Sequence, residues 1–270
     1  MSLQQVFRFS NQPTTAGWRL CVSRLGLLVM LAMLQACAAV PYKDPRDPME
    51  SWNRSVFSFN DSVDRAVVKP VASAYQKVLP HWVRTGIGNF FTNLDDVWSM
   101  VNNALQLRGR DTADSFGRVM VNTTMGLGGI LDVAGEMGME RHPANFGLTL
   151  GRWGVGPGPF VVLPLLGSSN LRDTLALPVD RQGNLLNQVQ DVPTRDALTI
   201  LNVVDTRATY LRAGDVVDGA ALDKYSFTRD AYLQRRRNQV YDGNPPDEDS
   251  TSADATLVPA APAIPASGAR

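Results

Sequence analysis

Residues 47–65, DPMESWNRSVFSFNDSVDR, predict the first helix of a mainly helical body. Asp47 is a typical N-cap residue, Pro48 suits the first helical position, and Glu50 stands three residues after Asp47, as in a capping box. Apolar residues then recur at helical spacing, namely Met49, Trp52, Val56, Phe59 and Val63. We therefore expect an amphipathic helix from Asp47 onward, whose apolar stripe, taken by itself, faces a protein core.

Helical spacing of apolar residues continues along most of the chain. Such residues run from Val83 to Leu105 and stop near Gly109, and Asp111 is placed to cap a further helix. The later segments with helical patterning are 169–175, 198–211, 216–222 and 231–240. Alternating strand patterns are scarce and no long internal repeat occurs. We therefore expect a mainly α body over about residues 46–241.

Two glycine-rich segments interrupt these helices. Gly126, Gly128 and Gly129 fall within four residues, which indicates backbone angles that other residues resist, or a joint that bends. Residues 146–167, FGLTLGRWGVGPGPFVVLPLLG, contain too much glycine and proline for a regular helix or a central strand. Their side chains are mostly apolar, so they do not suit a solvated loop. Protein core, lipid or a partner must cover them.

The first 36 residues have the composition of an export signal. Arg8, Arg19 and Arg24 are the only charged residues among them, and the apolar run at 25–34 follows. At about 10 residues this run is too short to span a bilayer, which needs roughly 20. We expect residues 1–36 to be removed on export.

Cys37 follows the apolar run in the sequence LQAC, which resembles the lipobox of bacterial lipoproteins, although Gln35 stands where a small residue is more usual. Cleavage before Cys37 would discard Cys21 and leave no pair for a disulfide within the chain. A diacylglyceryl thioether together with an N-acyl chain anchors a protein stably to a membrane. The sequence therefore predicts lipidation at Cys37, with residues 37–45 as a linker.

An ordinary secretory cut near Ala36 or Ala39, with Cys37 unmodified, is the alternative. The residues after Cys37 lack the aspartate that retains many enteric lipoproteins in the inner membrane. This favours anchoring to the outer membrane on its periplasmic face. At the other end, residues 242–270 are rich in Pro, Ala, Ser, Thr and Asp, a composition typical of a disordered tail.

Charge and motif content exclude several classes of function. Lys+Arg and Asp+Glu both number 26, and loss of the three signal arginines leaves a net charge of −3, so nucleic-acid binding has no support. His81 and His142 show no metal-binding spacing, and no G-x-S-x-G nucleophile motif occurs. Neither glycine cluster fits a dinucleotide-binding loop. We expect no cofactor, metal or catalytic residue, and interpret Asp95 and Asp96 as a solvated helix face.

Short motifs run in order along the body of the chain. They are DPME (47–50), NRSVFSFND (53–61), NTT (122–124), GLGGILDVA (126–134), FGLTLG (146–151), WGVG (153–156), GPF (158–160), LPLLG (163–167), LRD (171–173) and VD (179–180). In this order they resemble the MlaA/VacJ phospholipid-binding lipoproteins over about residues 44–241. Departures are mild: Ser169 follows Ser168 where proline is frequent, and Phe160 replaces a frequent tyrosine.

The resemblance implies a ring of amphipathic helices that lies in the membrane plane, in the inner leaflet of the outer membrane, around a central amphipathic channel. It further implies a protein that removes misplaced phospholipid from the outer leaflet, sits beside a trimeric porin, and passes lipid to a soluble periplasmic carrier. Two alternatives stay open. One is a porin-associated scaffold without its own lipid conduit, and the other is a phospholipase-like hydrolase, which the missing nucleophile motif disfavours.

We hypothesise that the stripe on the first helix and the glycine-rich segment, which resembles the family's channel-flanking hairpin, jointly set the opening of the channel. The candidate channel or gate residues are Val56, Phe57, Phe59, Asn60, Gly126, Gly128, Gly129 and Asp132. Tight turns and close packing would explain the glycines almost as well.

Overall fold

The computed structural model describes residues 44–246. The predicted export signal, the lipidation site at Cys37 and most of the predicted tail lie outside the described residues. Within residues 44–246 the chain is mainly helical, which confirms the predicted fold class. None of the helices in this part is both long and apolar enough to cross a membrane.

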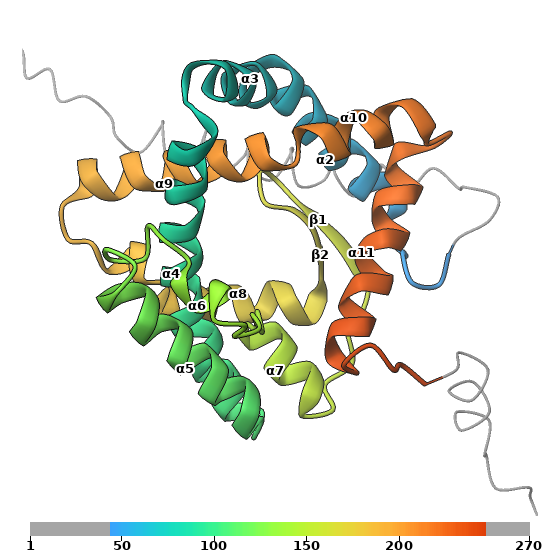
Figure 1. The fold of residues 1–270 in the computed structure, drawn as a ribbon. Helices are drawn as coiled ribbons and strands as arrows, with labels where there is room; N and C mark the ends of the chain where they lie inside the picture. Colours follow the sequence, from blue (N-terminus) through green and yellow to red (C-terminus); the bar gives the residue numbers. More distant parts are fainter. Residues whose placement is uncertain (1–43, 247–270) are drawn as a thin grey trace, which may run out of the picture.

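The helices and strands follow in chain order and carry the labels of Figure 1. They are α2 (Glu50–Val63), the π-helical turn η1 (Asp64–Val68), α3 (Lys69–Val78), α4 (His81–Leu105), α5 (Gly109–Thr124), α6 (Val133–Glu136), α7 (Phe146–Arg152), β1 (Phe160–Leu163), β2 (Gly167–Asn170), α8 (Leu171–Gly183), the 3₁₀ turn η2 (Leu185–Gln188), α9 (Val192–Thr209), α10 (Leu211–Ala220) and α11 (Lys224–Val240).

Figure 1 shows these elements arranged around a central space that no backbone segment crosses. Helix α9 borders one side of this space, α4 the next, α8 and α7 a third, and the β1–β2 hairpin with α11 the fourth. The 25-residue α4 packs against α5, α7 and α9, so it supports neighbours on several sides. Segments that are far apart in the sequence therefore border the same central space (Figure 1).

The first helix begins later than the sequence predicts. Helix α2 starts at Glu50 with Met49 at its N-cap position, and no side chain caps it. Asp47 is fully buried instead, and its carboxylate accepts hydrogen bonds from Asn53 Nδ2 at 2.7 Å and from the Tyr225 hydroxyl. The predicted capping box is wrong, because Asp47 joins α2 to α11 rather than binding the N–H groups of its own helix.

The apolar stripe of α2 also differs from the expectation. Met49, Trp52 and Phe59 are exposed by 39% to 53%, and Val56 is the one stripe residue that is buried. The expectation of a core-facing stripe is therefore wrong for most of its residues. An exposed stripe of this kind is suited to an apolar environment outside the protein.

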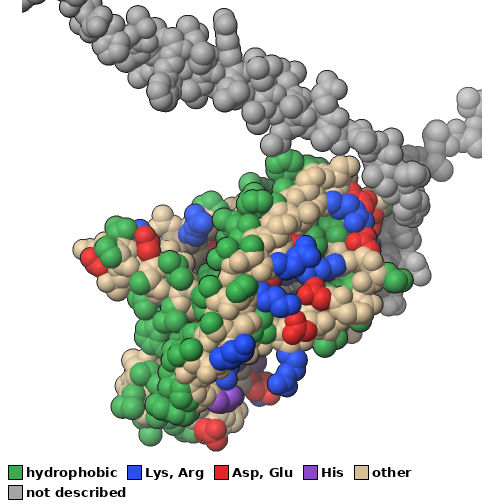
Figure 2. All heavy atoms as spheres, turned by 90° about the horizontal axis from the view of Figure 1, so that it is seen from above, with side chains coloured by type: hydrophobic (Ala, Val, Ile, Leu, Met, Phe, Trp, Pro, Cys, Tyr) green, Lys and Arg blue, Asp and Glu red, His purple; other side chains and the backbone are tan. Residues whose placement is uncertain are grey.

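The buried residues of this protein are unusually polar. Among residues 44–246, the buried residues comprise 12 hydrophobic and 17 polar or charged ones, while 32 large hydrophobic side chains are exposed. Single exposed hydrophobic residues are ordinary in soluble proteins. In this protein, Figure 2 shows exposed hydrophobic side chains next to one another over much of one face, with a band of Lys, Arg, Asp and Glu across that face. The hydrophobic residues of this fold therefore lie largely on its outside.

The glycine- and proline-rich segment is more regular than predicted. It contains the short helix α7, whose N-cap Asn145 accepts a hydrogen bond from the Leu148 N–H at 3.0 Å, and the strand β1, which pairs antiparallel with β2 at the end of the segment. Phe160 and Val162 of β1 are buried in a cluster with Val56. The expectation that no regular helix forms here is wrong, because the glycines and prolines fall mainly in the connections between short elements. The two-stranded sheet in residues 44–246 has no central strand, as expected.

The start of α5 differs from the prediction by a few residues. This helix begins at Gly109, so Asp111 lies in its first turn rather than at the cap. A carboxylate there still interacts favourably with the helix dipole. The predicted helical segments that became α4, α9, α10 and α11 are confirmed.

Candidate functional site

Three neighbouring cavities lie between the helices of the described part of the chain. The α3–α9 cavity, of about 1120 Å³, is lined by α3, α4, α9 and α10. The α5–α11 cavity, of about 1020 Å³, is lined by the start of α5, by α7 and by α11. The junction cavity, of about 550 Å³, lies between α4, α7, α8 and α11 and shares residues with both of the others.

Three charged residues border more than one of these cavities. Arg141 borders all three, Asp95 borders the α3–α9 and junction cavities, and Arg235 borders the α5–α11 and junction cavities. All three therefore line the junction cavity. Two cations and one carboxylate meet where the cavities adjoin.

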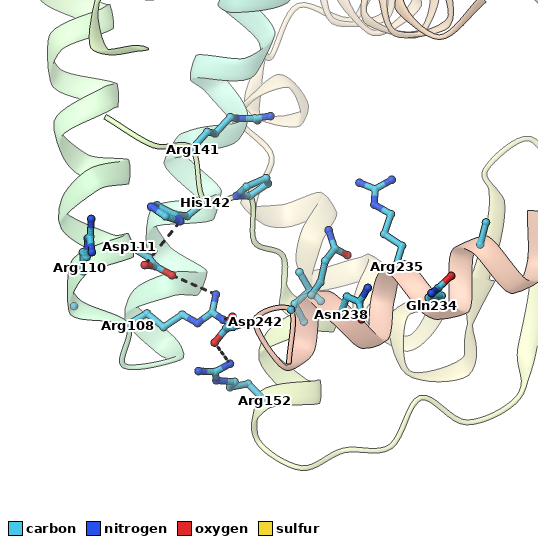
Figure 3. Close-up of a pocket in the computed structure, with 16 residues that line it drawn as sticks. Arg108, Arg110, Asp111, Arg141, His142, Arg152, Gln234, Arg235, Asn238 and Asp242 are labelled. Atoms are coloured by element: carbon cyan, nitrogen blue, oxygen red, sulfur yellow. Dashed lines mark hydrogen bonds and ion pairs between the residues drawn. The ribbon is translucent and has the colours of Figure 1, made fainter. Parts of the chain in front are cut away.

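Figure 3 shows the α5–α11 cavity, whose walls carry several arginines. Arg108 pairs with Asp111 at 3.3 Å, and Asp242 pairs with both Arg108 and Arg152. Figure 3 shows the side chains of Arg141 and Arg235 extending from opposite walls toward the same open region. The cavity can thus present positive charge to an anionic group.

A chain of ion pairs runs from Arg141 into the protein. Arg141 Nε lies 2.7 Å from Asp96 Oδ1, Arg118 Nε lies 3.2 Å from Asp96 Oδ2, and Arg118 Nη2 lies 2.9 Å from Asp132 Oδ1. The side chains of Asp96 and Arg118 are only 2% and 4% exposed. The interpretation of Asp96 as part of a solvated helix face is therefore wrong, because buried charges require partners. We call Asp132, Arg118, Asp96 and Arg141 the charge chain.

The charge chain links the cavity wall to the glycine-rich turn that follows α5. Burial of Asp132 opposes its ionisation, but hydrogen bonds from Asn122 and Arg118 and from the Gly135 N–H outweigh this and lower the pKa of Asp132. Asp132 also caps α6 through the bond from Gly135. The ionised carboxylate therefore fixes the end of the turn.

Asp95, the neighbour of Asp96 in sequence, faces the cavities. Its side chain is accessible from them, yet the surrounding helices displace much of its water, and this raises the pKa of Asp95. The charge of Arg141 opposes the rise, and that of Asp96 adds to it. Adjacent carboxylates in one helix thus have different environments.

The glycine-rich turn has the strained backbone that the sequence predicts. Gly128 and Gly129 have φ angles of +74° and +94°, a region that L side chains rarely adopt. A Cβ atom on Gly129 would lie 2.7 Å from the Cβ of Asn93 in α4, and Asn89 Nδ2 donates to the carbonyl of Ile130 at 3.0 Å. Close packing on α4 therefore requires glycine at position 129.

Gly126 meets a different constraint. A Cβ atom there would lie 2.2 Å from the carbonyl oxygen of Leu131 and 2.5 Å from that of Asn122, so the backbone itself excludes a side chain. The turn is therefore closed tightly at both ends.

The candidate residues on α2 lie on another side of the central space (Figure 1). Val56 packs in the cluster with β1, and the ring of Phe57 contacts that of Tyr225 edge-on at 5.6 Å. Asn60 Nδ2 donates to the carbonyl of Leu163 at 2.9 Å, and its Oδ1 accepts from the Leu165 N–H at 2.8 Å. Asn60 therefore fastens the hairpin to α2, while Phe59 points outward and is 53% exposed.

The structure thus places the predicted residues in two groups, one against the hairpin and α11, the other against α4 and α5. Neither group lines any of the three cavities described above. Sequence reasoning missed Arg141 and Arg235 as cavity residues. The run of three arginines at 235–237 was the available signal, since α11 turns one of them toward the cavities and Arg236 toward Asp173.

The two histidines have local partners. His142 Nε2 lies 3.2 Å from Asp114 Oδ2, and His81 Nδ1 lies 3.2 Å from the Thr85 hydroxyl. Within residues 44–246, no group of three or more His, Cys, Asp or Glu side chains is placed to hold a metal ion.

Residues 45–239 match a protein family described as MlaA lipoprotein. The intermembrane phospholipid transport system lipoprotein MlaA of Escherichia coli (strain K12) is 35% identical over 221 residues, which cover 80% of this chain and 87% of that protein. A protein of Rickettsia felis is 42% identical over 197 residues, covering 72% of this chain and 78% of its own length.

A solved structure reported on the structural basis for maintenance of bacterial outer membrane lipid asymmetry has a similar fold. It superposes with a TM-score of 0.64 at 35% sequence identity, and the match covers 73% of this chain and 99% of that one.

Proposed function

This chain belongs to the MlaA lipoprotein family, and on that premise we propose that it extracts mislocalised phospholipid from the outer leaflet of the bacterial outer membrane. The lipid passes through the adjoining cavities at the centre of the molecule and leaves on the periplasmic side. Removal of these lipids maintains the lipid asymmetry of the membrane.

The observation that carries this proposal is the reversed distribution of polarity. Large hydrophobic side chains are on the outside of the helices, whereas arginines, aspartates and amides line the cavities between them. A membrane supplies the apolar surroundings that the outside needs, and a polar path through the centre suits a lipid headgroup. In this proposal the helices lie in the membrane plane, with their exposed hydrophobic side chains against lipid.

Such a path addresses a large energy barrier. A diacyl phospholipid carries about 30 methylenes, so exposing them to water costs on the order of 20 kcal/mol at about 0.8 kcal/mol for each methylene. A sheltered path lowers this barrier by keeping the tails against apolar surfaces. It requires neither covalent chemistry nor a cofactor from this chain.

We further propose the cellular setting of the protein. The three acyl chains of a diacylglyceryl thioether and an N-acyl group at Cys37 hold it in the outer membrane on the periplasmic face. A porin trimer beside it supplies further protein surface for its apolar exterior. A soluble periplasmic carrier of the Mla pathway receives the lipid, since acyl chains need continuous shelter from water.

The proposal includes the hypothesis that α2 and the glycine-rich turn set the opening of the lipid path. The glycine-rich turn and the α2 residues Val56, Phe57, Phe59 and Asn60 flank the path without lining the three cavities. They set its width through the elements they hold: α4 and α5 on one side, and the hairpin on the other.

Photocrosslinking in living bacteria tests the conduit. A photoreactive amino acid at Thr92, in the α3–α9 cavity, or at Leu177, in the junction cavity, is expected to form phospholipid adducts. The same group at Val162, which is 1% exposed in the protein core, is the control and should form none. Absence of adducts at both cavity positions would favour a porin-associated scaffold without its own conduit.

A further inference from the structure

We propose that Arg141, Arg235 and Asp95 form a binding site for a zwitterionic phospholipid headgroup in the junction cavity. The two arginines bind the phosphodiester, and the carboxylate of Asp95 binds the headgroup amine. This inference rests on the proposed function and specifies the class of lipid that its central cavity accepts.

The two arginines have donors left for a ligand. Arg141 uses its Nε for Asp96, and its two terminal nitrogens make no hydrogen bond within residues 44–246. Arg235 is exposed and has no ion pair in that part of the chain. A guanidinium group binds a phosphate through two parallel hydrogen bonds, which makes arginine well suited to a phosphodiester.

The other arginines that border the α5–α11 and junction cavities are paired with carboxylates. Each one that borders the α5–α11 or the junction cavity has an acidic partner, in the pairs Arg108–Asp111, Arg110–Asp114, Arg152–Asp242 and Arg236–Asp173. Arg141 and Arg235 are the two whose outer nitrogens remain directed at the open space (Figure 3). An external anion is therefore drawn to this pair.

Asp95 supplies the opposite charge. Its carboxylate has neither an ion pair nor a hydrogen bond within residues 44–246, although Arg141 is close enough for its charge to act on Asp95. A partly desolvated carboxylate without a partner is stabilised by a cation. A ligand with an ammonium group linked to a phosphate would place its cation against Asp95 and its anion against Arg141 and Arg235.

The size and the remaining walls of the junction cavity fit a headgroup. A volume of about 550 Å³ is within the usual range for small-ligand sites. Trp98, Leu148 and Leu177 also line it and offer apolar surface to the glycerol and the first methylenes of the tails. The ion pair with the buried Asp96 keeps Arg141 in place before the ligand arrives.

The test uses the full-length lipidated protein purified in detergent, with two photoreactive probes. One is a phosphatidylethanolamine and the other a phosphatidylglycerol, each with a diazirine in the same acyl chain. At subsaturating probe, Arg235→Gln and Arg141→Gln should each lower capture of both lipids by about tenfold, equivalent to about 1.4 kcal/mol. Asp95→Asn should lower capture of phosphatidylethanolamine alone, because phosphatidylglycerol has no amine.

Matched controls come from α9. Arg195→Gln and Asp196→Asn make the same charge changes on neighbouring residues that border none of the three cavities, and should leave capture of both probes unchanged. Arg235 and Asp95 are accessible side chains, so their substitution leaves the fold intact, and a thermal unfolding scan checks Arg141→Gln separately.

The outcomes separate the two proposals. Capture by the wild type that none of the three variants reduces would overturn the headgroup site and leave lipid transport standing. A wild type that captures neither probe would overturn both. Displacement of the probe by inorganic phosphate or glycerophosphoethanolamine as readily as by unlabelled phosphatidylethanolamine would assign the site to soluble phosphate esters, against a lipid.

Discussion

Individual charged residues hold distant elements of this protein together. The Asp173 carboxylate on α8 accepts hydrogen bonds from Arg236 Nε at 2.7 Å and from the Tyr232 hydroxyl at 2.8 Å, both on α11. Burial opposes the ionisation of Asp173, but these partners and Arg172 lower its pKa. The charge chain does the same work between α4, α5 and the glycine-rich turn. Polar contacts thus fix positions that a small hydrophobic core leaves free.

Arg118 is the residue whose loss should matter most for stability. Arg118→Met leaves Asp96 and Asp132 with one cationic partner fewer in a buried site, which costs about 3–5 kcal/mol. Thermal unfolding in detergent should show a midpoint lower by about 10 °C for a chain of this size. Arg110→Met makes the same change on the same helix at a side chain that is 86% exposed, and should shift the midpoint little. Equal shifts would contradict a structural role for the charge chain.

Acid should weaken the fold through Asp132. Its pKa is lowered in the folded protein, so its ionised form contributes stability that is complete above the unfolded value near 3.8 and is lost as the pH falls below it. Asp132→Asn should therefore be less stable than the wild type at neutral pH and should lose less additional stability as the pH falls from about 5 to about 3. Unfolding midpoints across this range measure both effects. Asp196→Asn, at an exposed site, should keep the wild-type slope.

At the scale of elements, sequence periodicity identified the helices because their apolar residues recur on one side whatever that side faces. Periodicity does not distinguish the side that faces the core from the side that faces outward. It therefore predicts a core position for Trp52 and Phe59, which are exposed. Local rules likewise assigned Asp47 to a cap, whereas Tyr225, far along the chain, determines its position. The cavity group of Arg141, Arg235 and Asp95 forms only when three separate segments are brought together.

The glycine-rich turn allows a clean test of gating. A Cβ atom on Gly128 would meet no atom within 4 Å, so Gly128→Val adds backbone strain at φ +74° without a clash. Gly154→Val adds comparable strain at φ +93°, also without a clash, in the connection between α7 and β1. We expect Gly128→Val to change the outer-leaflet phospholipid content of bacteria, measured with an impermeant amine-reactive label, and Gly154→Val to leave it unchanged. Indistinguishable variants at equal expression would remove the turn from the gate.

The molecule as a whole has a hydrophobic exterior and a polar interior, whereas a soluble protein has the reverse. Its exterior carries hydrophobic side chains on nearly every helix, and its centre collects charge and amides. Short polar contacts join the elements, and the three cavities lie between the helices. This arrangement suits a molecule that is surrounded by lipid tails and handles lipid heads within.

Tryptophan fluorescence can report on both surfaces at once. Trp82 and Trp153 are exposed by 76% and 55%, whereas Trp98 lines the junction cavity and donates through Nε1 to Asp180 at 2.8 Å. In bilayers of lipid brominated on its acyl chains, single-tryptophan proteins that keep Trp82 or Trp153 should be quenched by surrounding lipid. A protein that keeps only Trp98 should be quenched as well, because a lipid in transit brings bromine into the cavity. Quenching of Trp82 without quenching of Trp98 would mean that lipid surrounds the molecule but does not enter it.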